Sequence, residues 1–414
     1  APTRPAAVIR YTADKQLHYQ PSWPTMSDFQ PSSPALPQRE RLLLLGALTG
    51  AAALGLAACG STKTESSAAP TPAKPASHAQ PRRARSGQVQ PMPLNGSYAQ
   101  RADAMAEVPE IARRTGLPET WVRNAIGNAN YLSSVPRLIL PAGRGVRRNW
   151  RVYRSRFVEP IRIRAGVNFW RQNLATLQRA EREYGVPMKY IVGIIGVETI
   201  YGRNKGDMRV IDTLSTLTFD FPQAHPRARE RHAFFQGELD HYLQLTWDNR
   251  DDPLALRGSY AGAMGLPQFM PSSWVKHAVD FDDDGHIDLI NNTVDTIGSV
   301  ANYFKQYGWV TGLEPVFDVR FDTSRLQLPT LLGPDIVPSF TPQQFAELGA
   351  VVELPRGFDQ KLALIELENG NAPSSYRAGT QNFYVITRYN NSSYYAQSVI
   401  DLADEVEKVI RRGG

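Results

Sequence analysis

The sequence feature that most constrains the fold is a largely apolar segment, residues 187–201, that contains a single acidic residue, Glu198. Pro187 stands where a helix would begin, a position at which the missing N–H of proline costs nothing. Apolar side chains then recur around most of the helix circumference. A helix that is apolar on nearly all sides is buried. The segment therefore predicts a buried helix with one carboxylic acid in its last turn.

The predicted position of Glu198 gives its carboxyl group unusual chemistry. We expect the helix to end at Gly202, since glycine commonly caps helix C-termini. Burial and the negative end of the helix dipole both disfavour the charged carboxylate, so both raise its pKa. A carboxylic acid that stays protonated near neutral pH can donate a proton to a leaving oxygen. The commoner alternative for a lone Glu at a helix end is an ion pair, here with Arg203 or Arg209.

Helical periodicity extends over much of the chain after residue 95. Apolar residues recur at helical spacing in four further segments, 99–115, 117–126, 149–157 and 167–184. Stretches rich in β-branched and aromatic residues, bounded by turn formers, predict short strands over 361–367 and 382–387. These patterns indicate a mainly α fold (α+β) over residues 96–414, with a small β element near the C-terminus.

The first 59 residues have the pattern of a leader with a lipoprotein signal peptide. The first methionine is Met26, so we expect residues 1–25 to precede the natural start. A charged flank, Arg39-Glu40-Arg41, is followed by an uncharged apolar run that is marginal for a membrane-spanning helix. The run ends in Leu56-Ala57-Ala58-Cys59-Gly60, which resembles the lipobox of bacterial lipoproteins, where the cysteine is lipidated. An ordinary signal peptide or membrane anchor with an incidental cysteine is the alternative.

The residues after Cys59 suggest where the chain is held. Gly rather than Asp at position 60 resembles the sorting signal for the outer membrane of Gram-negative bacteria, so we expect a lipid anchor on its periplasmic face. Residues 60–95 are rich in Ser, Ala, Pro, Thr and Gln. Such a segment cannot bury enough apolar surface to offset its chain entropy. It is expected to be a disordered tether between the lipid and the globular part of the chain.

Composition excludes several classes of protein. Cys59 is the only cysteine among the 414 residues, which rules out an internal disulfide framework and any multi-cysteine metal site. The net charge of +6 would suit a polyanionic surface. The basic residues are scattered, however, and no DNA-reading motif is present. We therefore expect no nucleic-acid partner.

Four sequence blocks carry a family resemblance. They cover residues 191–202 (IVGIIGVETIYG), 258–273 (GSYAGAMGLPQFMPSS), 297–304 (IGSVANYF) and 387–390 (TRYN). Because they are long, ordered and widely spread, chance does not explain them. Together they resemble the membrane-bound lytic murein transglycosylase B family, which acts on peptidoglycan. The resemblance implies a lysozyme-like helical catalytic core with an additional helical region.

The same resemblance implies roles for individual residues. Glu198 corresponds to the single catalytic acid/base of the family. Residues that correspond to substrate-binding positions of the cleft are Ser259, Gln268, Tyr303, Tyr389, Asn390, Tyr395 and Tyr153. For each aromatic residue, packing in the core is the alternative. Residues 220–231 form a longer loop than the family pattern has, so some substrate contacts around it are expected to differ.

The residue types around Glu198 favour one reaction over others. Ordinary glycosidases use two carboxylates, but Ser259, Gln268 and Asn390 in the matching blocks are neutral. We therefore expect a lytic transglycosylase that cleaves the β-1,4 bond between N-acetylmuramic acid and N-acetylglucosamine. Glu198 would act first as acid and then as base, leaving 1,6-anhydromuramic ends. A hydrolytic muramidase of the lysozyme type and a non-enzymatic peptidoglycan-binding lipoprotein are the alternatives.

Residues 280–288 match the start of an EF-hand calcium loop. Aspartates fall at the first, third and fifth positions and a glycine at the sixth. So many acids would repel one another without a cation, so we predict a structural Ca²⁺ site and no catalytic cofactor. The resemblance implies a longer loop, 280–295, although this chain carries one residue more before its closing acid. The ligands expected are Asp280, Asp282, Asp284, the carbonyl of His286 and Asp295. A solvated acidic turn is the alternative.

The expected partners follow from these assignments. They are the glycan strands of peptidoglycan and the membrane, reached through the N-terminal lipid anchor. Proteins of cell-wall synthesis are further candidates.

Overall fold

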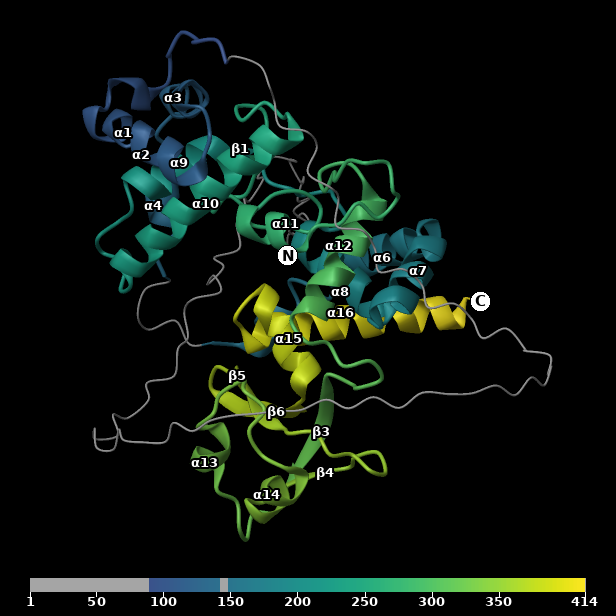
Figure 1. The fold of residues 1–414 in the computed structure, drawn as a ribbon. Coiled ribbons are helices and arrows are strands. Elements are labelled where there is room, and N and C mark those ends of the chain that lie inside the picture. The colour runs from purple at the N-terminus through teal and green to yellow at the C-terminus, as the bar shows by residue number, and fades with distance from the viewer. Residues whose placement is uncertain (1–88, 142–147, 414) are drawn as a thin grey trace, which may run out of the picture.

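The structure is a computed structural model that describes residues 89–141 and 148–413. Helices dominate it, and two small antiparallel sheets accompany them (Figure 1). The mainly α class with a small β element is therefore confirmed. The predicted leader with Cys59, and the tether as far as residue 88, lie outside the described residues. None of the described helices is both long and apolar enough to cross a membrane.

An N-terminal group of helices packs with two later ones in the upper left of Figure 1. The group comprises η1 Ser97–Gln100, α1 Ala102–Ala106, α2 Val108–Thr115, α3 Glu119–Gly127, α4 Val135–Leu138, α9 Val210–Phe219 and α10 Ala228–Asn249. The prediction of one continuous helix over 99–115 is wrong, because α1 and α2 are separated at Glu107. Pro109 explains the break, since its ring and missing N–H do not allow the preceding turn to continue.

A second group of helices forms the central bundle. It comprises α5 Trp150–Arg154, α6 Pro160–Gln172, α7 Leu174–Tyr184, α8 Met188–Thr199, α11 Pro271–His277, α12 Thr293–Gln306, α15 Gln381–Tyr389 and α16 Ser393–Arg412. Helix α8 packs against α6, α7, α12 and α16, so the buried helix predicted from the apolar segment is confirmed. Gly193 allows the closest approach, because a Cβ there would lie 2.7 Å from the Val399 carbonyl oxygen of α16.

Two predicted helices of this bundle are shorter than expected. The helix over 167–184 is interrupted at Asn173, whose side-chain amide donates to the Phe169 carbonyl (2.8 Å) and ends α6. The helix predicted over 149–157 is present only as α5. The chain does not continue from α5 into α6 as one helix, because Glu159 precedes Pro160, a position that disfavours the helical conformation, and has extended backbone geometry.

The strands form a two-stranded and a four-stranded sheet. The first pairs β1 Met208–Arg209 with β2 Arg257–Gly258. The second has the order β4-β3-β6-β5 and is made of β3 Val316–Phe321, β4 Ala350–Val352, β5 Ala363–Asn369 and β6 Ala372–Gly379. Helices α13 Leu328–Leu332 and α14 Pro342–Glu347 pack with this sheet around a small core of its own, in the lower part of Figure 1.

One of the two predicted strands is confirmed and the other is wrong. The strand expected over 361–367 corresponds to β5. Residues 382–387 instead lie in α15, where the Thr380 side chain accepts from the Asn382 N–H and caps the helix. A short apolar run fits either a strand or a buried helix, so periodicity could not decide between them. As a consequence, α15 carries Tyr389 and Asn390 to the end of α8.

Candidate active site

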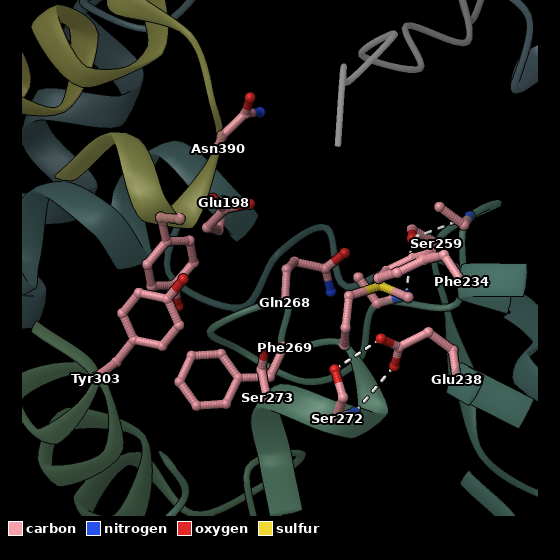
Figure 2. Close-up of a pocket in the computed structure, with 14 residues that line it drawn as sticks. Glu198, Phe234, Glu238, Ser259, Gln268, Phe269, Ser272, Ser273, Tyr303 and Asn390 are labelled. Carbon is pink, nitrogen blue, oxygen red and sulfur yellow. Dashed lines mark hydrogen bonds between the residues drawn. The ribbon is translucent and has the colours of Figure 1, made fainter. Parts of the chain in front are cut away.

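A cleft lies beside the C-terminal end of α8. Figure 2 shows that its walls come from the end of α8, from α12 and α15 on one side, and from α10 and the segment 258–273 on the other. Six residues singled out from the sequence line it: Glu198, Ser259, Gln268, Tyr303, Tyr389 and Asn390.

Glu198 occupies the last turn of α8 and faces the cleft. The helix ends at Thr199, and the next residue, Ile200, is its C-cap with φ +51°, so the predicted cap at Gly202 is wrong. Burial raises the pKa of Glu198 to about 8, while a hydrogen bond from Tyr395 and the charge of Arg162 partly oppose this shift. The group therefore remains mostly a neutral acid at pH 7.

The ion-pair alternative for Glu198 meets a structural obstacle. The Arg209 guanidinium donates to both carboxylate oxygens of Asp212, at 2.8 and 2.6 Å, and to the Asn128 carbonyl at 3.0 Å. Arg209 is thus committed elsewhere. Arg203 is exposed, whereas Glu198 is half-buried and faces the cleft.

Tyr395 is a direct partner of Glu198. Its hydroxyl donates to Glu198 Oε1 at 2.5 Å. The side chain is fully buried in the first turn of α16 and does not line the cleft. The structure therefore places Tyr395 behind the carboxyl group, where it fixes one oxygen and leaves Oε2 for the cleft.

Ser259 and Gln268 lie on the segment that faces Glu198. Ser259 Oγ accepts from the backbone N–H groups of Ala261 (3.3 Å) and Ala263 (3.1 Å). The Gln268 amide nitrogen donates to the carbonyls of Lys205 (3.0 Å) and Gly265 (2.9 Å). Its amide oxygen is then oriented away from these bonds. Figure 2 shows Gln268 in the middle of the cleft, between Glu198 and Ser259.

Tyr303 and Tyr389 form the aromatic wall. Their hydroxyls donate to the backbone carbonyls of Arg388 (2.6 Å) and Pro267 (2.7 Å), and their ring centroids are 4.7 Å apart. Both rings are largely enclosed. Since the hydroxyls are already engaged, what these residues offer the cleft is aromatic surface.

Asn390 leaves a buried polar atom open. The residue is 5% exposed, and its Oδ1 has no hydrogen-bond partner among the described residues. A buried acceptor without a partner is costly unless a ligand or water satisfies it. Asn390 stands next to Glu198 in Figure 2, so a ligand at this end of the cleft would meet both.

Tyr153 is not brought to the cleft. It packs on α5 in an aromatic cluster with Trp150, Phe157 and Tyr394, at centroid distances of 6.4, 5.0 and 5.6 Å. The core-packing alternative weighed for this tyrosine describes its surroundings better than a place beside Glu198 does.

Glu238 is a second carboxyl group in the cleft that the sequence analysis missed. It projects from α10, is 2% exposed, and accepts from the Ser272 N–H (2.9 Å) and hydroxyl (2.6 Å). Burial raises its pKa, and the Ser272 hydrogen bonds oppose the shift. The sequence around Glu238 gives no indication that this side chain is buried, because α10 is only weakly amphipathic. Tertiary packing is what turns the residue inward.

Comparison with known proteins decides the family. Residues 100–404 match the family model described as Transglycosylase SLT domain. Membrane-bound lytic murein transglycosylase B of Escherichia coli is 39% identical over 323 residues, which are 76% of this chain and 85% of that protein.

The chain belongs to the lytic transglycosylase family. The predicted enzyme class, a lytic transglycosylase acting on peptidoglycan, is thereby confirmed. The E. coli lytic transglycosylase Slt35 in complex with calcium matches this structure with a TM-score of 0.67 at 39% identity, over 76% of this chain and 96% of that one. This likeness confirms the predicted lysozyme-like helical core.

A more distant structure has a bound ligand. SltB3 of Pseudomonas aeruginosa in complex with NAG-anhNAM-pentapeptide matches with a TM-score of 0.61 at 28% identity, over 73% of this chain and 78% of that chain.

The acidic loop of this lytic transglycosylase gathers three of the expected ligands. Carboxylate oxygens of Asp280, Asp282 and Asp284 lie within 4.8 Å of one another. Left-handed backbone geometry at Asp283 (φ +61°) and Gly285 (φ +85°) turns the loop around them. Clustered carboxylate oxygens are the ligands that Ca²⁺ prefers, so the donor set fits the ion.

Asp295 has a different position from the other three acids. It is fully buried at the start of α12, where its two oxygens accept from the N–H groups of Phe281 (2.7 Å) and Asp288 (2.9 Å). It does not belong to the three-carboxylate cluster. The N–H of His286 donates to Asp284 (2.7 Å), which holds this part of the loop in a tight turn. In the described conformation Asp295 shapes the loop instead of closing the cluster.

Proposed function

We propose that Glu198 is the single acid/base of this lytic transglycosylase and that the enzyme cleaves the β-1,4 bond after N-acetylmuramic acid, leaving a 1,6-anhydro end. The observation that carries the proposal is an acid with a pKa of about 8 that faces a cleft while Tyr395 holds its other oxygen. The carboxyl group is thus protonated before the reaction and oriented toward the sugar.

In the first step, Glu198 Oε2 gives its proton to the oxygen that links the two sugars. The C1–O bond breaks, and N-acetylglucosamine leaves with the transferred proton. The positive charge at C1 is stabilised by the substrate's own 2-acetamido group. The Tyr395 hydroxyl favours the new carboxylate, because a hydrogen bond to the charged form lowers its free energy.

In the second step, the Glu198 carboxylate removes the proton of the muramoyl C6 hydroxyl. The C6 oxygen bonds to C1 and closes the 1,6-anhydro ring, so no water is consumed and Glu198 regains its proton. Its raised pKa suits both steps, because a group that titrates near the working pH exchanges protons most effectively. The anhNAM group in the SltB3 complex supports such a product.

We assign the neutral cleft residues to binding. The amide oxygen of Gln268 and the open Oδ1 of Asn390 accept from N–H or hydroxyl groups of the sugar near Glu198. The faces of Tyr303 and Tyr389 contact the pyranose ring. Ser259 binds the substrate from the opposite wall of the cleft.

Product analysis tests the proposal directly. Purified sacculi are digested with the enzyme and the released muropeptides are analysed by mass spectrometry. We expect 1,6-anhydromuramic ends, which are lighter by one water than hydrolysis products. Reducing ends would instead show that the enzyme acts as a hydrolytic muramidase.

The hydrolytic alternative would give the second carboxyl group of the cleft, Glu238, a catalytic role. A hydrolase would need Glu238 to activate water or attack C1. Both of its oxygens accept from Ser272, and in Figure 2 Gln268 stands between it and Glu198. This arrangement favours the single-carboxylate reaction.

The acidic loop is proposed to bind Ca²⁺ for structural reasons. Asp280, Asp282 and Asp284 supply the carboxylate cluster. The calcium complex of Slt35 supports the ion's identity. The loop has no residue in the cleft, so the ion is assigned to stability and not to proton transfer.

We also propose attachment to the periplasmic face of the outer membrane through lipid on Cys59. The lipobox-like sequence supports this anchor, and the E. coli relative is named as membrane-bound. Labelling of cells with a radioactive fatty acid tests it. The full chain should incorporate label and the Cys59→Ser variant should not; equal labelling of both would exclude the anchor at this residue.

A further inference from the structure

We infer that Glu238, the buried carboxyl group that the proposed reaction does not use, is a positioning residue that holds Gln268 at the reacting sugar. The inference rests on the proposed function, because it assumes that Gln268 binds substrate. It goes beyond that proposal by giving Glu238 a task in the same reaction.

The contacts of Glu238 tie α10 to the start of α11. One oxygen accepts from the Ser272 N–H at 2.9 Å and the other from the Ser272 hydroxyl at 2.6 Å, as the dashed lines in Figure 2 show. Ser272 is the second residue of α11, and the N-cap residue Met270 has no side-chain cap bond. The first N–H groups of a helix need acceptors, and a negative charge is favourable there. Glu238 thus caps α11 from a different helix.

The segment before α11 is anchored at its other end too. Thr199, the residue after Glu198, donates through its hydroxyl to the Leu266 carbonyl at 2.9 Å. The Leu266 N–H donates to the Leu289 carbonyl at 2.8 Å. Residues 267–271 therefore span the distance between an anchor at Leu266 and the Glu238–Ser272 contact.

Gln268 lies between these two anchors in a strained conformation. Its φ is +51°, which a non-glycine residue rarely adopts. Such a conformation persists only where the surroundings enforce it. The mutual backbone hydrogen bonds of Met264 and Phe269, at 2.9 and 3.0 Å, close the turn that contains Gln268. If the Glu238–Ser272 anchor is lost, we expect this turn to shift as a unit, which would move the Gln268 side chain from its position opposite Glu198.

A double-mutant cycle tests whether Glu238 acts through Gln268. The parent, Glu238→Gln, Ser272→Ala, Gln268→Ala and the two combinations with Gln268→Ala are assayed as full-length proteins on soluble peptidoglycan glycan strands. A broken hydrogen bond to a buried charged group is worth on the order of a tenfold change in an equilibrium. We therefore expect Glu238→Gln and Ser272→Ala each to lower kcat/KM about tenfold. If Gln268→Ala acts on kcat, these two variants should also act on kcat, and if it acts on KM, they should act on KM.

The decisive readout is the background with alanine at position 268. There we expect Glu238→Gln and Ser272→Ala to change kcat/KM less than about twofold, although their effect on the melting temperature persists. An equal loss in both backgrounds would overturn the inference and leave Glu238 with a structural role only. Loss as complete as that of Glu198→Gln would overturn it in favour of a second catalytic carboxylate.

A matched control uses another acid of the same helix. Asp240 pairs with Arg114 on the outer side of α10, with Nε to Oδ2 at 2.5 Å. Asp240→Asn removes the same charge and should leave kcat/KM unchanged. The product analysis stays separate: reducing ends would reject the proposed function, whereas anhydro ends together with an additive cycle would reject only the role of Glu238.

Discussion

The end of α8 and the loop 280–295 both present carboxyl groups, but they solve the problem of charge in opposite ways. Glu198 is the one acid of α8 and accepts from one phenol donor, and burial raises its pKa to about 8. The loop gathers Asp280, Asp282 and Asp284 within 4.8 Å, and two of them are exposed. A lone buried carboxyl group lowers its free energy by keeping a proton, whereas a cluster does so by binding a cation. The same chemical group therefore becomes a proton carrier in one place and a metal ligand in the other.

The largest effect should come from removing the proton carrier. Glu198→Gln should lower the rate of sacculus digestion by about 10²–10⁴-fold, the usual contribution of a general acid or base. Turbidity loss measures the rate, and circular dichroism checks that the fold is kept. Glu181→Gln changes a half-buried acid of α7 outside the cleft and serves as the control. Retained lysis in the Glu198 variant would remove this residue from its role.

The loop should respond to metal where the cleft does not. Bound Ca²⁺ at about a hundredfold excess over its Kd would stabilise the fold by roughly 2.7 kcal/mol. A chelator should therefore lower the melting temperature by several degrees in calorimetry. Asp282→Asn should shrink this difference, whereas Asp318→Asn on the exposed face of β3 should not. A transition that chelator leaves unchanged would favour the solvated acidic turn.

The two regions should also differ in the pH dependence of stability. Glu198 has its pKa raised from 4.5 to about 8, so between these values the folded protein holds a proton that the unfolded chain releases. Its contribution to stability is therefore lost progressively as the pH rises across this window. Glu198→Gln should melt a few degrees higher than the parent at about pH 8, and the difference should vanish toward about pH 4. A constant difference across the range would contradict the raised pKa.

The smallest effect should be a shift in the pH profile. Tyr395→Phe removes a hydrogen bond to the charged form of Glu198, so the pKa of Glu198 should rise further. The alkaline limb of kcat/KM should move up by about one pH unit, since a hydrogen bond to a charged group is worth about 1.5 kcal/mol and one pKa unit is about 1.4 kcal/mol. Tyr394→Phe is the control, because that hydroxyl donates to the Glu368 carbonyl. A downward shift would show that the phenol does not favour the carboxylate.

Part of the site could be predicted because its signals are local. The apolar segment 187–201 predicted both the buried helix and the position of its one acid, because periodicity reports which side chains are removed from water. The spacing of the aspartates from Asp280 to Asp284 likewise predicted a carboxylate cluster, since a tight turn brings such residues together whatever the rest of the fold does.

The other differences between expectation and structure concern contacts between distant segments. Tyr395 was expected in the cleft, but the packing of α16 on α8 places it behind Glu198. Tyr153 was expected beside the substrate, but α5 packs it against Trp150 and Tyr394. The strand predicted over 382–387 is the helix α15, because a short apolar run fits either structure until its neighbours are known.

The sequence by itself determined that this protein is a mainly helical lytic transglycosylase with Glu198 at the end of a buried helix. The period of the apolar side chains indicated the buried helix and its acid, because periodicity acts over a few residues, and the resemblance of four sequence blocks to a known family indicated the enzyme. Only the tertiary structure decided which groups surround that acid: the Tyr395 phenol, the open Asn390 acceptor and the Glu238 contact that caps α11. These groups lie far from α8 in the sequence. Helix packing brings Asn390 and Glu238 to the cleft and Tyr395 behind Glu198, where burial raises the pKa of the acid and the Tyr395 hydrogen bond partly opposes this shift.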